Sequence, residues 1–321
     1  MSDAKTMIKK VINNAILVRL IAIAFIALAF GAANWNYLKF QNLGNLMTNI
    51  SPYFIMSIGI TFVLMIGSID LSIGTMASLS AVVTALLLPK IGIWAFIPPI
   101  LLGILGGAIN GFLISKLKLP SFIATLGTMG IWSSTAYWIS GNKAVTFSRE
   151  LWIYVDWFKI NFGIIPVVFI GCIIIWGILY IIQNLTSFGK GVFATGVNER
   201  AAQVAGVNVV WIKMLAFTIS GLLSALAGIL LVVKSKGAVP YSGDAMTLLA
   251  ITAVVLGGTA LEGGKGGMLF TLLGSAMVVM IQNGLNIVGI TTFYQDIVFG
   301  LLIILAVFSS ADRSNRYVLV K

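Results

Sequence analysis

Long apolar runs separated by short polar joints fill almost the whole chain. A run of about 20 mostly apolar residues is long enough to cross a bilayer as a helix. The pattern predicts ten such runs, at about residues 11–33, 48–66, 72–89, 93–115, 120–140, 163–184, 212–233, 247–261, 268–289 and 293–309. We therefore predict an all-α polytopic membrane protein with about ten transmembrane helices, in which residues 1–321 form a single transmembrane domain.

Composition supports this class and narrows the chemistry. Of the 321 residues, 59% are hydrophobic and only 9% are charged, whereas soluble domains carry about 25% charged residues. The chain has no histidine, and its one cysteine, Cys172, lies in an apolar run. We therefore expect no metal site, no cofactor, no histidine-based catalysis and no internal disulfide.

The positive charge follows the topology and does not indicate a nucleic-acid partner. The net charge is +11, and the Lys and Arg residues flank the apolar runs. If the N-terminus is cytoplasmic, 13 of the 20 Lys and Arg residues fall on the cytoplasmic side and 7 fall outside. This bias predicts that both termini are cytoplasmic. The longest outer segment, residues 141–162, mixes aromatic and charged residues, which is typical of an interfacial helix.

The polar joint at residues 189–208, within a region of about 185–211, is longer than a simple turn requires. Asn198 is a good N-cap, Glu199 suits the positive end of a helix dipole, and Gly206 stands where a helix ends. The helix between them is built from small residues: Ala201, Ala202 and Ala205. A helix of about two turns is marginal alone in water. It needs a surface, which is either a groove in a cytoplasmic partner or the protein's own helix bundle.

Asp70 is the carboxylate with the most apolar surroundings, because only apolar and small residues flank it between the second and third runs. A carboxylate at membrane depth normally faces a protein interior or water. One interpretation is a broken helix that lines a pathway. The other is a cap, in which Asp70 or Ser72 bonds free backbone N–H groups at the start of the third run. The two interpretations are compatible.

Uncharged polar residues inside the runs indicate a weakly polar path. Asn110 lies beside a strip of glycines at positions 103, 107 and 111, which predicts close packing against another helix. Gln282, Asn283 and Asn286 cluster on one side of the ninth run. Amides of this kind suit a pathway for a neutral, hydroxylated solute, and they suit hydrogen bonds between helices equally well.

Nucleotide binding is excluded at the one stretch that superficially resembles a phosphate loop. The Walker spacing requires Gly, four residues, Gly-Lys and then Ser or Thr. Counting back from Gly264-Lys265, the first glycine is replaced by Thr259 and the last position is Gly266. A tight glycine turn on the cytoplasmic side explains this stretch, and ATP hydrolysis is not expected on this chain.

Five stretches carry a recognisable family pattern. They are Ile58–Leu64 with Gly67–Gly74, Pro120–Gly127, Thr195–Asn208, Ala253–Thr259 with Gly263–Gly266, and Asn283–Asn286 with Tyr294–Gln295. Together they resemble the ribose-type permease family of ABC importers, in the broader group of type II import permeases. Ser68 and Glu262 depart from the glycine and alanine expected there.

The resemblance implies a type II ABC importer permease of the bacterial inner membrane that works by alternating access. It also implies three partners: a cytoplasmic ABC ATPase, an extracytoplasmic sugar-binding protein, and a second permease subunit that is an identical or related chain. The residues that would couple to the ATPase are Gly196, Asn198, Glu199, Ala201, Ala202, Ala205 and Gly206.

Two other classes make different demands on the sequence. An ion-coupled secondary transporter needs titratable groups in mid-span, for which only Asp70 and Asp296 are candidates. An intramembrane enzyme needs a set of catalytic groups, which the sequence does not provide. The path residues we expect under the permease hypothesis are Asp70, Asn110, Gln282, Asn283 and Asn286, and the solute is a ribose-like monosaccharide or another small molecule.

Overall fold

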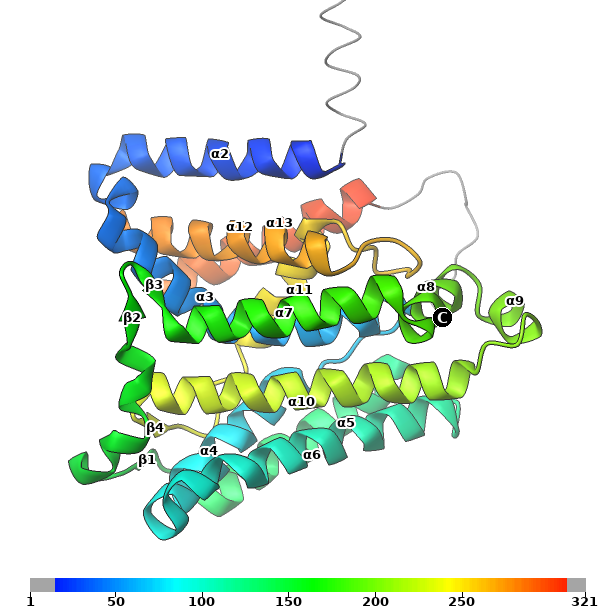
Figure 1. Cartoon of the computed structure of the whole chain (residues 1–321), viewed down its shortest axis with the longest axis horizontal. Coiled ribbons are helices and arrows are strands. Elements are labelled where there is room, and N and C mark those ends of the chain that lie inside the picture. The colour runs from blue at the N-terminus through cyan, green and yellow to red at the C-terminus, as the bar shows by residue number, and fades with distance from the viewer. Residues whose placement is uncertain (1–14, 311–321) are drawn as a thin grey trace, which may run out of the picture.

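The computed structural model describes residues 15–310, and residues 1–14 and 311–321 lie outside the described part. Within residues 15–310, a helix lies over each predicted apolar run, and Figure 1 shows that most of these helices follow the long axis of the molecule. They are α2 (Ala15–Ala33), α3 (Phe40–Met65), α4 (Ile73–Ile91), α5 (Ile97–Ser115), α6 (Ser121–Ser140), α7 (Val167–Leu185), α10 (Val209–Ser235), α11 (Met246–Gly257), α12 (Met268–Ile287) and α13 (Thr292–Ser310). The α-helical class is confirmed for this part of the chain.

Six helical segments of the described part are long and apolar enough to cross a membrane. One of them, Ile73–Ser115, joins α4 and α5 through the short 3₁₀ helix η2 (Gly92–Phe96). Helix α11 has only 12 residues, too few to span about 30 Å of hydrocarbon by itself. The protein is therefore a multi-pass membrane protein, whereas ten crossings and cytoplasmic termini stay predictions.

Two predicted boundaries are wrong for identifiable reasons. Helix α3 begins at Phe40 and not near residue 48, because polar side chains in its first turns find partners inside the fold, as Asn42 does with Asn283. Helix α11 ends at Gly257 and not at residue 261. Gly258 takes a left-handed φ of +113°, which ends a helix at little cost only when the residue is glycine.

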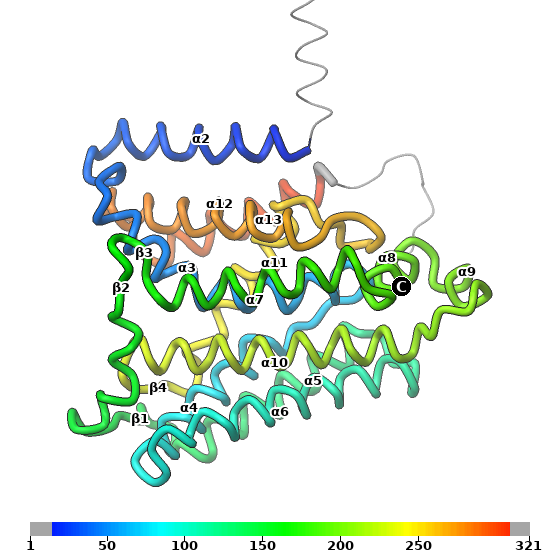
Figure 2. The backbone as a smooth tube through the Cα atoms, viewed as in Figure 1, coloured from blue at the N-terminus to red at the C-terminus, as the bar shows by residue number. Residues whose placement is uncertain are grey.

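The outer segment at residues 141–162 does not form the predicted interfacial helix. It forms two 3₁₀ helices, η3 (Arg149–Tyr154) and η4 (Asp156–Lys159), and contributes to two strand pairs. Strand β1 (Val145–Thr146) pairs with β4 (Gly237–Ala238), and β2 (Asn161–Phe162) pairs with β3 (Ile165–Pro166), both antiparallel. Strand β1 finds its backbone partner more than ninety residues along the chain, whereas β2 pairs with the strand that directly follows it. Figure 2 shows these segments at the end of the molecule opposite α9 (Glu199–Val204).

The core lies around α3 and α10. Phe54, Phe62 and Phe217 are completely buried there. Helix α5 approaches α10 through the predicted glycine strip, since a Cβ added at Gly111 would lie 2.8 Å from the Cα atom of Met214. This packing prediction is confirmed, and it places α4, α5, α6 and α10 close enough to share polar contacts.

Candidate functional site at the two ends of the bundle

The polar joint between α7 and α10 contains two helices, of which the sequence predicted only the second. The first, α8 (Ser187–Val197), begins where the Thr186 hydroxyl accepts a hydrogen bond from the Gly189 amide at 3.3 Å. The second, α9, begins where the Asn198 side chain accepts from the Ala201 amide at 3.0 Å. The short capped helix predicted at 198–205 is thus confirmed: Asn198 is its N-cap, Glu199–Val204 are helical, and Ala205 is its C-cap.

Helix α9 is held in place by its ends. The Lys213 ammonium of α10 lies 2.7 Å from a carboxylate oxygen of Glu199 in the first turn of α9. At the other end Gly206 takes a left-handed φ of +87°, as predicted for the residue after a helix. Figure 1 shows α9 projecting beyond the ends of the long helices.

The alanines of α9 do not share one surface, which corrects our expectation that they fit a partner groove together. Ala202 is only 5% exposed, because it packs toward the bundle. Ala201 and Ala205 are exposed, and Val204 is 90% exposed. The interpretation that the short helix lies against its own bundle therefore holds for the face that carries Ala202. The opposite face is exposed, and a partner groove for it stays a prediction.

Gly196 lies in a junction of three chain segments. A Cβ at Gly196 would lie 2.5 Å from the Gly264 amide nitrogen and would overlap the Met65 carbonyl oxygen. That oxygen accepts a hydrogen bond from the Gly264 amide at 2.9 Å. The end of α8, the end of α3 and the turn before α12 therefore meet with their backbones in direct contact.

The stretch at residues 258–266 is a glycine turn, as predicted. Gly258, Gly263, Gly264 and Gly266 all have positive φ values, between +70° and +113°. Those φ values and the contact with Met65 account for its glycine content, and no phosphate-binding role is needed to explain it.

Asp70 stands at the centre of a buried polar network. Its Oδ1 accepts from the Ser72 amide at 3.0 Å and the Ser72 hydroxyl at 2.6 Å, and its Oδ2 accepts from the Ser220 hydroxyl at 2.9 Å. The Asn110 amide donates to the Ser72 hydroxyl at 2.9 Å, and the Thr128 hydroxyl donates to Asn110 at 2.8 Å. Four helices, α4, α5, α6 and α10, are joined through these side chains.

This network supports the capping interpretation only in part: Asp70 accepts from the amide of Ser72, whereas the Ser72 side chain makes no capping hydrogen bond to the first turn of α4. Asp70 and Asn110 are each 1% exposed, and Ser72 is the residue before the first turn of α4. The carboxylate accepts from the amide at that helix end and so performs part of a cap. Whether Asp70 and Asn110 also border a solute path stays a prediction.

The three amides of α12 lie elsewhere, and they lie together. Gln282, Asn283 and Asn286 line a cavity of about 160 Å³ between α3, α10 and α12. Its residues from α10 and α12 stand near the C-terminal ends of those helices, and Figure 1 shows these ends away from α9. The remaining lining residues are Asn49, Tyr53, Lys234 and Val279. The three amides that the sequence placed on one side of the ninth run thus lie together in the structure. Asp70 and Asn110 do not line this cavity, and the sequence could not indicate that they lie apart from the amides.

Asn49, Tyr53 and Lys234 are residues of this pocket that the sequence did not single out. The Lys234 ammonium donates to the Asn49 side chain at 2.6 Å, which joins α10 to α3. The only signal in the sequence was a lysine at the end of an apolar run, and that position is typical of any span. The role of Lys234 depends on which helix lies opposite its side chain, and the sequence does not give that helix.

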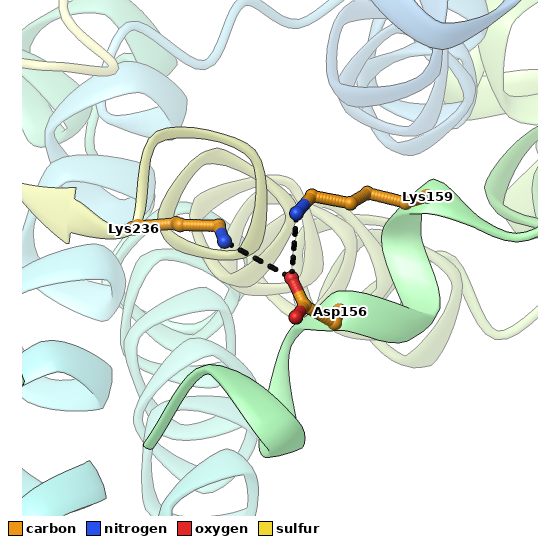
Figure 3. Close-up of polar contacts among 3 residues, drawn as sticks. All are labelled: Asp156, Lys159 and Lys236. Atoms are coloured by element: carbon orange, nitrogen blue, oxygen red, sulfur yellow. Dashed lines mark hydrogen bonds and ion pairs between the residues drawn. The ribbon is translucent and has the colours of Figure 1, made fainter. Parts of the chain in front are cut away.

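A cluster of three charged residues holds the outer segments together. Figure 3 shows the Asp156 carboxylate between Lys236 at 3.0 Å and Lys159 at 3.1 Å. Hydrogen bonds from Lys236 and then Lys159 lower the pKa of the Asp156 carboxyl below its ordinary value. The Lys236 ammonium also lies 3.2 Å from the centre of the Trp152 ring, a cation–π contact. The cluster ties the end of α10 to η3 and η4.

Comparison with known proteins gives consistent matches. Residues 42–307 match the family model described as branched-chain amino acid transport system / permease component. The chain is 35% identical to the ribose import permease protein RbsC of Bacillus subtilis over 288 residues, which covers 88% of each chain. It is 34% identical to the ribose import permease protein RbsC of Escherichia coli K12, over 90% of this chain and 91% of that one. It is 36% identical to the L-arabinose transport system permease protein AraH of Escherichia coli K12, over 89% and 87%. No solved structure matches.

Proposed function

This chain belongs to the branched-chain amino acid transport system / permease component family, as a ribose-type ABC permease, and from that premise we propose that it forms the membrane path of an ATP-driven importer for a monosaccharide such as ribose. It is a multi-pass protein of the bacterial inner membrane. The similarity to ribose and arabinose permeases over nearly the whole chain supports sugar as the solute class.

The observation that carries the mechanism is the arrangement of α9 and the amide pocket at opposite ends of one bundle. In the proposed cycle a separate cytoplasmic ATPase pushes on the open face of α9, which exposes Ala201, Val204 and Ala205. A sugar-binding protein delivers the solute at the other end. Each partner must favour a different state of the permease for ATP to drive transport.

The junction at Gly196 would transmit a movement caused by the ATPase into the helix bundle. A displacement of α8 would be transmitted directly to Met65 of α3 and to Gly264, because no side chain separates these backbones. Close-packed elements shift as units and are not deformed continuously. Movement at α9 is therefore expected to reach α3 and α12, and both helices line the amide pocket.

The remaining partners follow from the family. A second permease subunit, identical or related, would complete the translocation path in the bilayer, and the outer segments around η3 and η4 are where we expect the sugar-binding protein. ATP hydrolysis takes place on the ATPase subunit, since this chain carries no nucleotide-binding pattern.

Uptake in proteoliposomes tests the proposal. The permease is reconstituted with its ATPase and sugar-binding partners, and ATP-dependent accumulation of labelled ribose and arabinose is measured. Val204→Trp should lower uptake severalfold while leaving the protein folded, because Val204 is 90% exposed on α9. Val18→Trp is the matched control, since it enlarges an exposed valine of α2, a helix that contributes no residue to the pocket.

Three outcomes separate the hypotheses. ATP-dependent uptake that Val204→Trp impairs and Val18→Trp does not would support the coupling role of α9. Normal uptake by Val204→Trp would refute that role and leave the permease function standing. Sugar uptake by this chain alone, driven by an ion gradient without any ATPase, would instead favour a secondary transporter.

A further inference from the structure

The pocket between α3, α10 and α12 contains a positive charge that no lining carboxylate balances. Lys234 is the one charged residue among its seven lining residues. The others are three asparagines, one glutamine, one tyrosine and one valine. Among the described residues, therefore, the pocket is uniformly neutral or positive.

Lys234 differs in this respect from its neighbour Lys236. Figure 3 shows Lys236 paired with Asp156, and its ammonium is stacked on Trp152. The partner of Lys234 is the neutral side chain of Asn49, at 2.6 Å. Lysines near the C-terminal end of a helix often only complement its dipole. The Lys234 ammonium, however, donates one N–H to a side chain of another helix, and the residue remains exposed.

Two of the amides that line the pocket with Lys234, Asn49 and Asn286, have side-chain N–H groups without a hydrogen-bond acceptor among the described residues. The side-chain oxygen of Asn49 accepts from Lys234, and that of Asn286 accepts from Gln295 at 2.7 Å. The side-chain N–H groups of Asn49 and Asn286 take part in none of the hydrogen bonds made among the described residues. A pocket with spare N–H donors and one ammonium is complementary to oxygen acceptors.

We propose that this pocket is an outward-facing solute site in which Lys234 selects for hydroxylated solutes without positive charge, neutral or acidic, and excludes cationic ones. The inference rests on the proposed permease function and adds a charge criterion at a named residue. An ionisable side chain in a membrane helix normally faces a water-filled cavity, and low-dielectric walls concentrate its field inside that cavity. Lys234 is therefore a specificity-determining residue that acts before the solute moves deeper.

Thiol labelling tests this without knowledge of the solute. Cys172 is the one cysteine of the chain and is buried, so Cys172→Ser gives a cysteine-free background. Gln282→Cys then places a single thiol in the pocket. Two methanethiosulfonate reagents of similar size are compared on the assembled transporter in proteoliposomes, one bearing a sulfonate and one a trimethylammonium group. Their rates are normalised to those with a small free thiol.

A nearby fixed positive charge should make the sulfonate reagent react about five- to tenfold faster than the trimethylammonium reagent, for unit charges about 7 Å apart in water. Lys234→Gln, which keeps a donor for Asn49, should bring the ratio close to one. Lys90→Gln is the matched control, because it removes an exposed lysine that does not line the pocket. It should leave the ratio unchanged.

The outcomes are distinguishable. Equal normalised rates for the two reagents, or a ratio that Lys234→Gln does not change, would overturn the role of Lys234 and leave the permease function intact. No labelling of Gln282→Cys by either reagent would overturn the pocket as a solute site. ATP-dependent sugar uptake, measured in the same proteoliposomes, reports separately on the permease function.

Discussion

An alanine at Gly103 would place a methyl group between α5 and α10. Its Cβ would lie 2.5 Å from the Cβ of Ala225 and 2.5 Å from the carbonyl oxygen of Gly221. Carbon atoms in contact normally lie about 3.5–4.0 Å apart, so the two helices must move apart by about 1 Å at this point. Neither obstacle can rotate away, because one is backbone and the other is bonded directly to it.

The magnitude follows from two opposing effects. Overpacking a close-packed contact costs about 1–3 kcal/mol. Replacing glycine by alanine in a helix returns up to about 1 kcal/mol through helix propensity. We therefore expect Gly103→Ala to lower the free energy of unfolding by about 1–2 kcal/mol, since separation at Gly103 also loosens the next contacts along the strip.

Unfolding by SDS in mixed micelles, followed by tryptophan fluorescence, measures this difference. Gly127→Ala in α6 is the matched control, because a Cβ there meets nothing within 4 Å. That variant should be as stable as the wild type or slightly more stable. If Gly103→Ala were equally stable, the close approach of α5 to α10 would be refuted.

Three further predictions concern the cap, the outer cluster and the buried network. Asn198→Ala removes the N-cap of α9 and should cost about 1 kcal/mol of helix stability. ATP-driven uptake should therefore fall in this variant. Asn198→Asp, whose side chain also caps a helix, should retain ATP-driven uptake. The pKa of Asp156 is lowered by Lys236 and Lys159, so its stabilisation is present above the unfolded-state pKa and is lost as pH falls through the folded-state pKa. Asp156→Asn should therefore reduce the loss of stability between neutral pH and about pH 3, and an unchanged acid profile would contradict this. Asn110→Leu removes two buried hydrogen bonds at similar volume and should cost about 1–2 kcal/mol in the SDS assay; wild-type stability would show that they contribute nothing net.

The sequence alone determined the features that depend on neighbours within about one helical turn. The apolar runs predicted the helices because a backbone in hydrocarbon must satisfy its own hydrogen bonds. Asn198 and Gly206 predicted the ends of α9, since a cap joins residues only three or four positions apart. The glycine turn at 258–266 and the packing strip on α5 were likewise local patterns with one physical explanation each.

Only the tertiary structure decided which helices face one another. Asp70 and Ser220 are 150 residues apart and share a hydrogen bond, and Lys234 meets Asn49 across 185 residues. Ala202 and Val204 are both apolar residues of the same short helix, yet Ala202 is buried and Val204 is 90% exposed. In a chain where most residues are apolar, hydrophobicity does not separate the bundle interior from the lipid face. The packing of α3, α10 and α12 therefore created the pocket, and with it the position of Lys234, from residues that no local pattern connects.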